Sequence, residues 1–365
     1  MKKEHLLVIR FSAIGDVAMM VPVIHALAQR YPHVRITVLS RPFARTFFDD
    51  LAPNVNFMAA DVKQDYRGVK GLNRLYRRLT AKQFTAVADL HSVLRSDYLR
   101  MRFNLGRYRV EHIRKERHQR RQLVAPEGKK QLVQLKTPFE KYADVFARLG
   151  YPIDTPTFRS VFEPFGTTPP SPDTPVQRGN LNLLPKAVGE KRSWEQWIGI
   201  APFAAHEGKI YPTELMWQAV TQLATHYPKA RFFLFGRGQR EAALFAQWAN
   251  ELPRCLNVAQ HTQTIYEELI VMSHLDVMIS MDSANMHLAS LTATPVVSIW
   301  GATHPLAGFM GWNQDPDNAV QAQLPCRPCS IYGQKACRRG DYACLKAIQP
   351  AVIAQKAISI IERQP

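Results

Sequence analysis

The feature that most constrains the fold is an alternation of short apolar runs with amphipathic helical patterns, which occurs twice along the chain. In the first half the apolar runs lie at residues 6–11, 34–40, 55–59, 84–90 and 108–113. In the second half they lie at residues 197–203, 230–236, 255–259, 276–281 and 294–300. Alternation of this kind predicts parallel sheets covered by helices. We therefore expect an α/β chain with two doubly wound domains that face one another across a cleft.

The stretch between the two halves has a different composition. Prolines and small polar residues gather in "TTPPSPDTP" at residues 167–175, which is typical of a linker. The full length of 365 residues is also too long for one ordinary core. We therefore predict four parts, which are an N-terminal domain at 1–160, a linker at 161–192, a C-terminal domain at 193–349 and a C-terminal helix at 350–365.

Composition excludes several classes of protein. Hydrophobic residues make up 46% of the chain, which excludes a disordered protein. No apolar run approaches the length needed to span a bilayer. The basic start "MKKEH" leads directly into the first apolar run, so we interpret it as the start of a strand rather than a signal peptide and expect a cytoplasmic protein.

The net charge of +17 indicates a negatively charged partner, such as a polyanion or an anionic membrane surface. Lys and Arg are concentrated between Lys63 and Arg121, and a solvated face is the simpler alternative for this stretch. We find no nucleic-acid-binding module, and aromatic residues do not interleave the arginines as base stacking would require. We therefore expect no nucleic-acid partner, although a non-enzymatic protein that binds polyanions stays open as an alternative.

Four of the five cysteines fall within "CRPCSIYGQKACRRGDYAC". A C-x-x-C pair followed by two more cysteines is compatible with a structural zinc site, and free or buried thiols are the alternative. Four thiolates would leave no open position on the metal, which disfavours a catalytic zinc. Both alternatives stay open for Cys326, Cys329, Cys337 and Cys344.

A turn of small residues and then a carboxylate follow the first apolar run. Ser12, Ala13 and Gly15 allow a ligand to approach the backbone closely, and Asp16 stands where a helical pattern begins. In open α/β sheets this carboxyl end of a strand faces the ligand crevice. Asp is also a favoured helix cap. Asp16 is therefore a candidate catalytic base, with helix capping as the simpler alternative.

Two further strand-to-helix loops carry polar residues in the second half. In the first loop, Lys209 lies shortly before a helix start at Pro212 and could reach a diphosphate, or could be merely solvated. In the second, a buried strand ends in "DSANMH", whose free helix amides and side-chain donors could bind a phosphate. The alternative is that these residues only cap the helix and fill the core. The candidates in that loop are Asp282, Ser283, Ala284 and His287.

Four stretches together resemble glycosyltransferase family 9, the bacterial ADP-heptose:lipopolysaccharide heptosyltransferases. They are "IRFSAIGDVAMMVPVIHAL", "VADLHSVLRS", the K-x-Y-P of residues 209–212, and "MDSANMHLASLTATPVVSIWGATHP". The resemblance runs from the first apolar run to about residue 305, with the motifs in the family's order. Two departures are "DSA" where the family often has Asp-Thr-Gly, and "FAAH" at 203–206 in place of a hydroxyl-rich run.

The resemblance implies a GT-B fold of two Rossmann-like domains, with the acceptor on the first and the nucleotide-sugar on the second. It implies inverting transfer of a heptose or related sugar from an ADP-sugar to the lipopolysaccharide core or a related glycolipid, without a catalytic metal or cofactor. Asp16 matches the proposed base, Lys209 the phosphate-contacting lysine, and the loop from Asp282 to His287 the donor site. We assign Ser12, Gly15 and Arg95 to the acceptor side.

The resemblance also implies a phosphorylated glycolipid acceptor, and so a cytoplasmic protein that binds peripherally at the inner face of the bacterial inner membrane. A nucleotide-sugar epimerase or hydrolase on the same fold is the alternative among enzymes.

Overall fold

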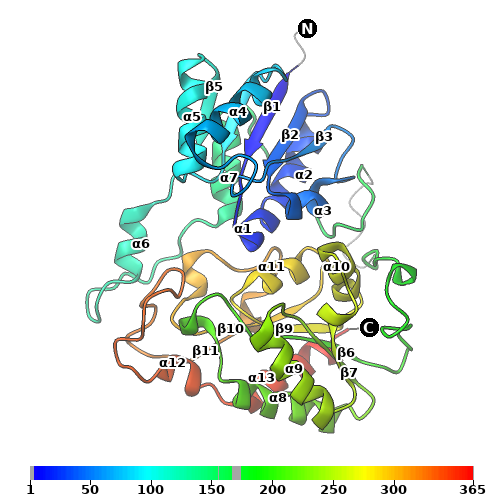
Figure 1. Cartoon of the computed structure of the whole chain (residues 1–365). Helices are drawn as coiled ribbons and strands as arrows, with labels where there is room; N and C mark the ends of the chain where they lie inside the picture. The colour runs from blue at the N-terminus through cyan, green and yellow to red at the C-terminus, as the bar shows by residue number, and fades with distance from the viewer. Residues whose placement is uncertain (1–3, 155, 167–173, 365) are drawn as a thin grey trace. The chain divides into compact units, whose positions relative to one another are not determined.

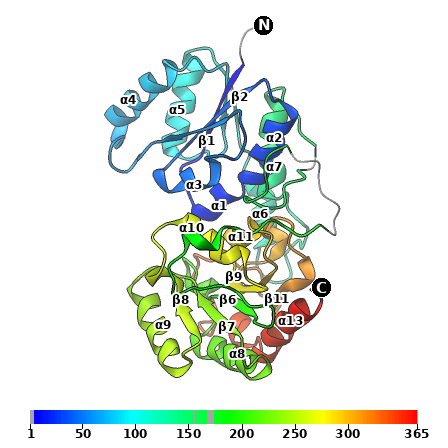
Figure 2. The same cartoon turned by 90° about the vertical axis from the view of Figure 1, so that its right-hand side faces the viewer.

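The computed structural model describes residues 4–154, 156–166 and 174–364, which form two compact units (Figure 1). The first unit comprises Met1–Lys115 and Lys136–Pro175, and the second comprises Glu116–Leu135 and Val176–Pro365. Each unit has its own parallel sheet with helices on both faces (Figure 2). The predicted α/β class with two doubly wound sheets is therefore confirmed.

The sheet of the first unit has five parallel strands in the order β3-β2-β1-β4-β5. The strands are β1 (His5–Ile9), β2 (Arg35–Ser40), β3 (Val55–Ala59), β4 (Ala86–Asp89) and β5 (Arg109–His112). The helices are α1 (Ile14–Ala18), α2 (Val21–Arg30), α3 (Arg45–Phe48), α4 (Gly68–Thr80), α5 (Leu94–Leu105) and α7 (Pro138–Arg148). Helices α2 and α7 pack together on one face, and α4 and α5 on the other (Figure 2).

The order of these strands creates a switch point beside β1. From β1 the chain proceeds to β2 on one side, and it later returns to β4 on the other. The loops after β1 and β4 therefore diverge, and ligands of doubly wound sheets bind in the crevice that such loops leave. The four aliphatic residues of β1, Leu6 to Ile9, are fully buried because helices cover both faces.

The sheet of the second unit has six strands in the order β11-β10-β9-β6-β7-β8. They are β6 (Trp197–Ala201), β7 (Arg231–Leu234), β8 (Cys255–Asn257), β9 (Val277–Met281), β10 (Val296–Trp300) and β11 (Ala319–Gln321). The helices of this unit are α6 (Arg117–Leu123), α8 (Thr213–His226), α9 (Gln239–Glu251), α10 (Ile265–Ser273), α11 (Ala284–Ser290), α12 (Ala343–Lys346) and α13 (Pro350–Glu362). By the same reasoning its switch point lies between the adjacent parallel strands β6 and β9.

All ten predicted apolar runs contain a strand, and β11 is an additional strand of three residues. The predicted C-terminal helix is α13, which packs against α8 and buries its apolar face in the core of the second unit. Local signals mark helix starts in the expected way. At α10, the Thr264 hydroxyl accepts the Glu267 N–H while the Glu267 carboxylate accepts the Thr264 N–H.

Residues 116–135 belong to the second unit although they lie within the first half of the chain. Leu123 and Leu135 pack in one apolar cluster with Ala307 and Ile331. The Leu135 N–H donates to the Leu306 carbonyl at 2.9 Å. This differs from the expected assignment of residues 1–160 to one domain. The sequence does not predict that residues 116–135 belong to the second unit. The few apolar residues of this stretch have no periodicity, so the pattern does not indicate in which core they pack.

Residues 116–121, the last part of the basic stretch between Lys63 and Arg121, therefore belong to the second unit. Arg117 and Arg121 are exposed on α6, whereas the Arg120 guanidinium contacts the Tyr332 hydroxyl and lies over the Phe309 ring. In the first unit Lys115 donates to the Ser92 carbonyl. The basic stretch is therefore divided between the units, and part of it is used in internal contacts.

Within the described residues, no helix is both long enough and apolar enough to cross a membrane.

Candidate functional site

In the first unit, Asp16 lies in the third position of α1, the helix that follows the switch-point strand β1. Its Oδ2 accepts the Ala13 N–H at 3.2 Å and lies 2.7 Å from Arg10 Nη2. The side chain of Asp16 is 32% exposed. Asp16 thus caps the helix from within its first turn and also presents a carboxylate that solvent can reach, so capping and catalysis are compatible.

Arg10, the first residue after β1, makes contacts with residues of several elements. It is only 8% exposed, and Nη1 donates to the Leu90 carbonyl at the end of β4. Its guanidinium lies 5.7 Å from the centroid of the Tyr142 ring. The Tyr142 hydroxyl donates to the Asp16 carbonyl at 3.1 Å. Helix α7 and the ends of β1 and β4 therefore position Arg10 and Asp16 together.

His91 follows β4 on the other side of the switch point. The Phe11 N–H donates to His91 Nδ1 at 3.4 Å, so Nδ1 is unprotonated and Nε2 carries the proton. His91 Nε2 lies 3.3 Å from Ser12 Oγ and can donate to it. Burial and the nearby Arg10 cation lower the pKa of His91 to about 3. The imidazole is therefore neutral at physiological pH and orients Ser12.

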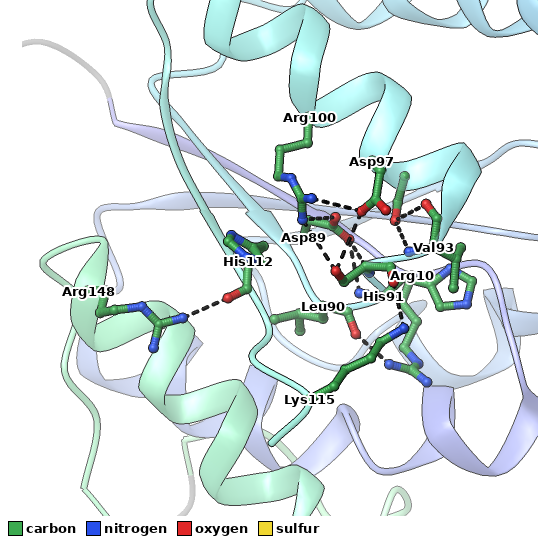
Figure 3. A network of polar contacts seen from close by, with 12 residues as sticks. Arg10, Asp89, Leu90, His91, Val93, Asp97, Arg100, His112, Lys115 and Arg148 are labelled. Atoms are coloured by element: carbon green, nitrogen blue, oxygen red, sulfur yellow. Dashed lines mark hydrogen bonds and ion pairs between the residues drawn. The ribbon is translucent and has the colours of Figure 1, made fainter. Parts of the chain in front are cut away.

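The loop that carries His91 is fixed by the fully buried carboxylate of Asp89 (Figure 3). Asp89 Oδ1 accepts the N–H groups of His91 and Ser92, each at 2.9 Å. Its Oδ2 lies 3.2 Å from Arg100 Nη1, and Arg100 also pairs with Asp97 at 2.9 Å. This network makes the carboxyl end of β4 a rigid support for the residues around Asp16.

The structure brings together most of the residues predicted for the acceptor side. Ser12, Gly15 and Asp16 share one turn, and Arg95 is exposed at the start of α5, near enough to His91 to contribute to lowering its pKa. Four polar residues of this site were not predicted from the sequence, which are Arg10, Asp89, His91 and Tyr142. A usable signal was available for the first two, since each is a charged residue at the carboxyl end of an apolar run.

In the second unit, Lys209 and Asp282 form an ion pair at the switch point. Lys209 follows β6 in the short helical turn η3 (Glu207–Lys209), and Asp282 directly follows β9. The distance from Lys209 Nζ to Asp282 Oδ2 is 3.0 Å, with side chains 16% and 5% exposed. Two residues predicted for the donor side from separate motifs are therefore in direct contact.

Close backbone packing holds the Lys209 turn in place. The Ala302 N–H donates to the Gly208 carbonyl at 2.8 Å, which joins the turn to the loop after β10. Gly333 has a φ of +78°, and a Cβ there would lie 2.4 Å from Lys209 Cγ. Only glycine adopts this conformation readily and leaves room for the lysine stem.

The loop from Asp282 to His287 forms the start of α11. Ser283 is the N-cap residue, but its hydroxyl caps no backbone N–H and lies 3.3 Å from Ser280 Oγ. Ala284 is the first helical residue, and His287 is 7% exposed on the first turn. The Ser283 hydroxyl is therefore not a side-chain cap, whereas the burial of His287 agrees with the simpler alternative, so a donor-binding role for this loop stays a prediction.

The loop with the four cysteines is anchored by Arg327. This arginine is 5% exposed and donates to the carbonyls of Trp300, Gly301 and Thr303, so it holds the end of β10. All five cysteines are free thiols. In the part of the chain that the structure describes, no group of three or more His, Cys, Asp or Glu side chains is arranged to hold a metal ion. The two alternatives, a structural zinc site and free thiols, both stay open for Cys326, Cys329, Cys337 and Cys344.

The first unit also has an open cavity of about 810 Å³ lined by residues that include Glu4, Thr85 and Arg109. These residues lie at the amino ends of β1, β4 and β5. The cavity is therefore at the sheet edge opposite Asp16.

Two doubly wound sheets in one chain, each with an ion pair at its switch point, give this chain the GT-B fold. The sequence profile of "Glycosyltransferase family 9 (heptosyltransferase)" matches residues 72–338, and the chain belongs to this family. A search of curated proteins found no match.

Solved structures similar to this chain have the same fold. A family 9 glycosyltransferase from Veillonella parvula is 15% identical with a TM-score of 0.70, covering 100% of this chain and 99% of that one. ADP-heptose lps heptosyltransferase II from E. coli is 16% identical with a TM-score of 0.65, covering 98% and 99%. E. coli heptosyltransferase WaaC with ADP is 16% identical with a TM-score of 0.58, covering 86% and 94%.

Proposed function

We propose that this protein is an inverting heptosyltransferase that moves a heptose or related sugar from an ADP-sugar to the lipopolysaccharide core or a related glycolipid. The observation that carries the proposal is the partly exposed Asp16 carboxylate, paired with a buried Arg10 at the switch point of the first unit. Family membership supports sugar transfer, and the similarity to heptosyltransferases described with ADP supports an ADP-linked donor.

In the proposed reaction Asp16 removes the proton from an acceptor hydroxyl. The acceptor oxygen then forms a bond to the anomeric carbon as the bond from that carbon to the diphosphate oxygen breaks. The electron pair leaves with ADP, and one displacement inverts the anomeric centre. General-base catalysis of this kind contributes about 10²–10⁴-fold to the rate.

The donor diphosphate is assigned to the second unit. Lys209 supplies a positive charge that Asp282 holds in place, and Ser283 supplies a hydroxyl at the start of α11. Ala284 and His287 complete this loop. Positive charge and donors placed at the leaving diphosphate stabilise the charge that develops there, so we propose that no divalent cation or other cofactor is needed for catalysis.

The acceptor is assigned to residues of the first unit around Ser12, Gly15 and Arg95. We propose a phosphorylated glycolipid acceptor and reversible binding to the inner face of the bacterial inner membrane. The exposed arginines of residues 114–121 support this proposal, because basic residues near an anionic surface contribute on the order of 1 kcal/mol each.

Product analysis with ADP-heptose and a lipopolysaccharide-core acceptor tests the function. We expect ADP release that requires the acceptor and persists in the presence of EDTA. Equal ADP release without acceptor would instead identify a hydrolase, and an altered free nucleotide-sugar an epimerase. The donor can be chosen by thermal stabilisation, because a ligand at about 100 times its Kd adds about 2.7 kcal/mol to the free energy of unfolding.

A further inference from the structure

Arg10 contacts the Leu90 carbonyl as well as the Asp16 carboxylate with which it pairs. Nη2 meets Asp16 Oδ2 at 2.7 Å while Nη1 donates to the Leu90 carbonyl, so the planar guanidinium joins the base candidate to the end of β4. The Tyr142 ring lies beside the guanidinium, and the Tyr142 hydroxyl holds the Asp16 backbone. Arg10 is therefore a rigid element between two strands and the first turn of α1.

The charged groups around this pair include two further cations, Lys115 and Arg95, which lie near enough to His91 to lower its pKa. His91 is held neutral beside them, so it does not compete with Arg10 for the negative charge of Asp16. The carboxylate of Asp89 pairs with Arg100 on the far side of the same loop. A cation held this close to a carboxylate favours its ionised form and restricts its rotation.

We propose that Arg10 is a positioning residue for the transfer reaction, which keeps the Asp16 carboxylate ionised and aimed at the acceptor hydroxyl. The inference rests on the proposed role of Asp16 as base. It assigns to Arg10 no contact with substrate, so its loss should reduce kcat and leave the affinity for the donor unchanged.

The first unit contains a matched control. Arg148 makes the same two kinds of contact. Its Nε pairs with Glu111 Oε2 at 2.9 Å. Its Nη2 donates to the His112 carbonyl at 2.7 Å (Figure 3). It joins α7 to the end of β5 and has no contact with Asp16. Arg148→Gln therefore reports the cost of losing a structural arginine in this unit.

The experiment measures kcat and KM of Arg10→Gln, Arg10→Lys and Arg148→Gln from about pH 5.5 to about pH 9. For Arg10→Gln we expect kcat/KM about 10²-fold lower at neutral pH, with the acid limb of the profile moved to higher pH and activity partly regained there. Arg10→Lys should keep the acid limb of the wild-type pH profile, because the positive charge remains. It should lose part of kcat, because an ammonium group cannot bind Asp16 and the Leu90 carbonyl together as the planar guanidinium does. Arg148→Gln should leave the profile unmoved.

A pH-independent loss in Arg10→Gln equal to that in Arg148→Gln would overturn the proposal. If Arg10→Gln does not fold, Arg10→Lys is the variant that tests the proposal. A kcat of Arg10→Lys identical to that of wild type would then exclude positioning of Asp16 by the guanidinium group. Asp16→Asn distinguishes failure of the proposed role of Asp16 as base from failure of the proposed positioning role of Arg10. Full activity in Asp16→Asn refutes the proposed base itself, whereas an inactive Asp16→Asn with an unmoved acid limb in Arg10→Gln refutes only the role of Arg10.

Discussion

Lys209 and Asp282 pair at 3.0 Å across the carboxyl ends of β6 and β9, and the same two strands have a second such pair at their amino ends. That second pair is Lys191 and Asp276, at 2.5 Å. The two lysine side chains are similarly covered, at 16% and 14% exposed. One sheet therefore carries two alike ion pairs, of which only the first lies at the edge where open α/β sheets bind ligands.

Replacing Lys209 should weaken nucleotide binding, and replacing Lys191 should not. A hydrogen bond to a charged group contributes about 1.5–3 kcal/mol, so Lys209→Ala should raise the Kd for ADP about 10- to 100-fold. Isothermal titration calorimetry with ADP measures both variants. Equal affinities for ADP in Lys209→Ala and Lys191→Ala would remove Lys209 from the donor site.

Asp16→Asn should abolish transfer while leaving ADP affinity nearly unchanged. The asparagine oxygen can still accept the Ala13 N–H, so the helix cap is retained while the negative charge is lost. We expect kcat to fall about 10²–10⁴-fold. Asp49→Asn, which breaks an exposed pair with Arg45, serves as the control. Near-normal turnover in Asp16→Asn would show that Asp16 is only a cap.

His91 should make the first unit sensitive to acid. Its pKa is about 3 when folded, against an ordinary value of 6.5, so the unfolded state binds more protons between these values and the free energy of unfolding falls as pH falls. From about pH 7.5 to about pH 5.5 the expected contribution is a loss of about 1.4 kcal/mol. Burial lowers the pKa of His25 to about 4, which adds to the same trend in the first unit. Burial and Arg327 lower the pKa of His304 to about 4, which has the same effect in the second unit.

Urea unfolding of wild type and His91→Gln, followed by circular dichroism at both pH values, isolates this contribution. Glutamine can replace both hydrogen bonds of the neutral imidazole and does not titrate. The variant should therefore lose about 1.4 kcal/mol less than wild type on acidification. The same pH dependence in both proteins would mean that His91 is not kept neutral by the fold.

Binding to anionic vesicles should depend on the exposed arginines of residues 114–121. Lys115 and Arg120 have internal contacts, so the informative variant replaces only the exposed arginines with Gln. These are Arg114, Arg117 and Arg121. At about 1 kcal/mol each, their loss should lower the partition coefficient up to about 100-fold, and high salt should do the same.

Vesicle co-sedimentation measures this binding. A control with the same change of net charge replaces three exposed basic residues of the second unit outside this stretch, which are Arg240, Lys346 and Arg363. An equal loss of binding in the control would assign the effect to total charge, and equal binding of wild type to neutral and anionic vesicles would exclude an electrostatic surface.

The cysteines should react with thiol reagents in a defined order. Although burial opposes it, hydrogen bonds from backbone N–H groups around Cys337 lower the pKa of its thiol. Burial raises the pKa of Cys344 to about 11 and that of Cys255 to about 12. Because the thiolate is the nucleophile, Cys337 should be alkylated first at neutral pH and Cys255 last. Mass spectrometry of partly alkylated protein gives the order. Protection of Cys337 that a chelator removes would instead identify the zinc site.

Much of the architecture follows from the sequence by itself. Apolar runs such as residues 6–11 and 276–281 form buried parallel strands. Their short length and their alternation with amphipathic helical patterns favour a strand over a buried helix. The turn containing Asp16 and the loop starting at Asp282 could be selected as well, since both place polar residues at the carboxyl end of such a strand.

Only the tertiary structure determined which of the candidate site residues contact one another. Lys209 and Asp282 are far apart in sequence, and they pair because β6 and β9 are neighbours in the sheet, which strand patterns do not specify. Arg10 became part of the site through Leu90, which directly follows β4, and through Tyr142 on α7. Residues 116–135 joined the second unit through a few long-range apolar contacts. Local patterns encode the elements, whereas partners distant in sequence depend on the packing of the whole chain.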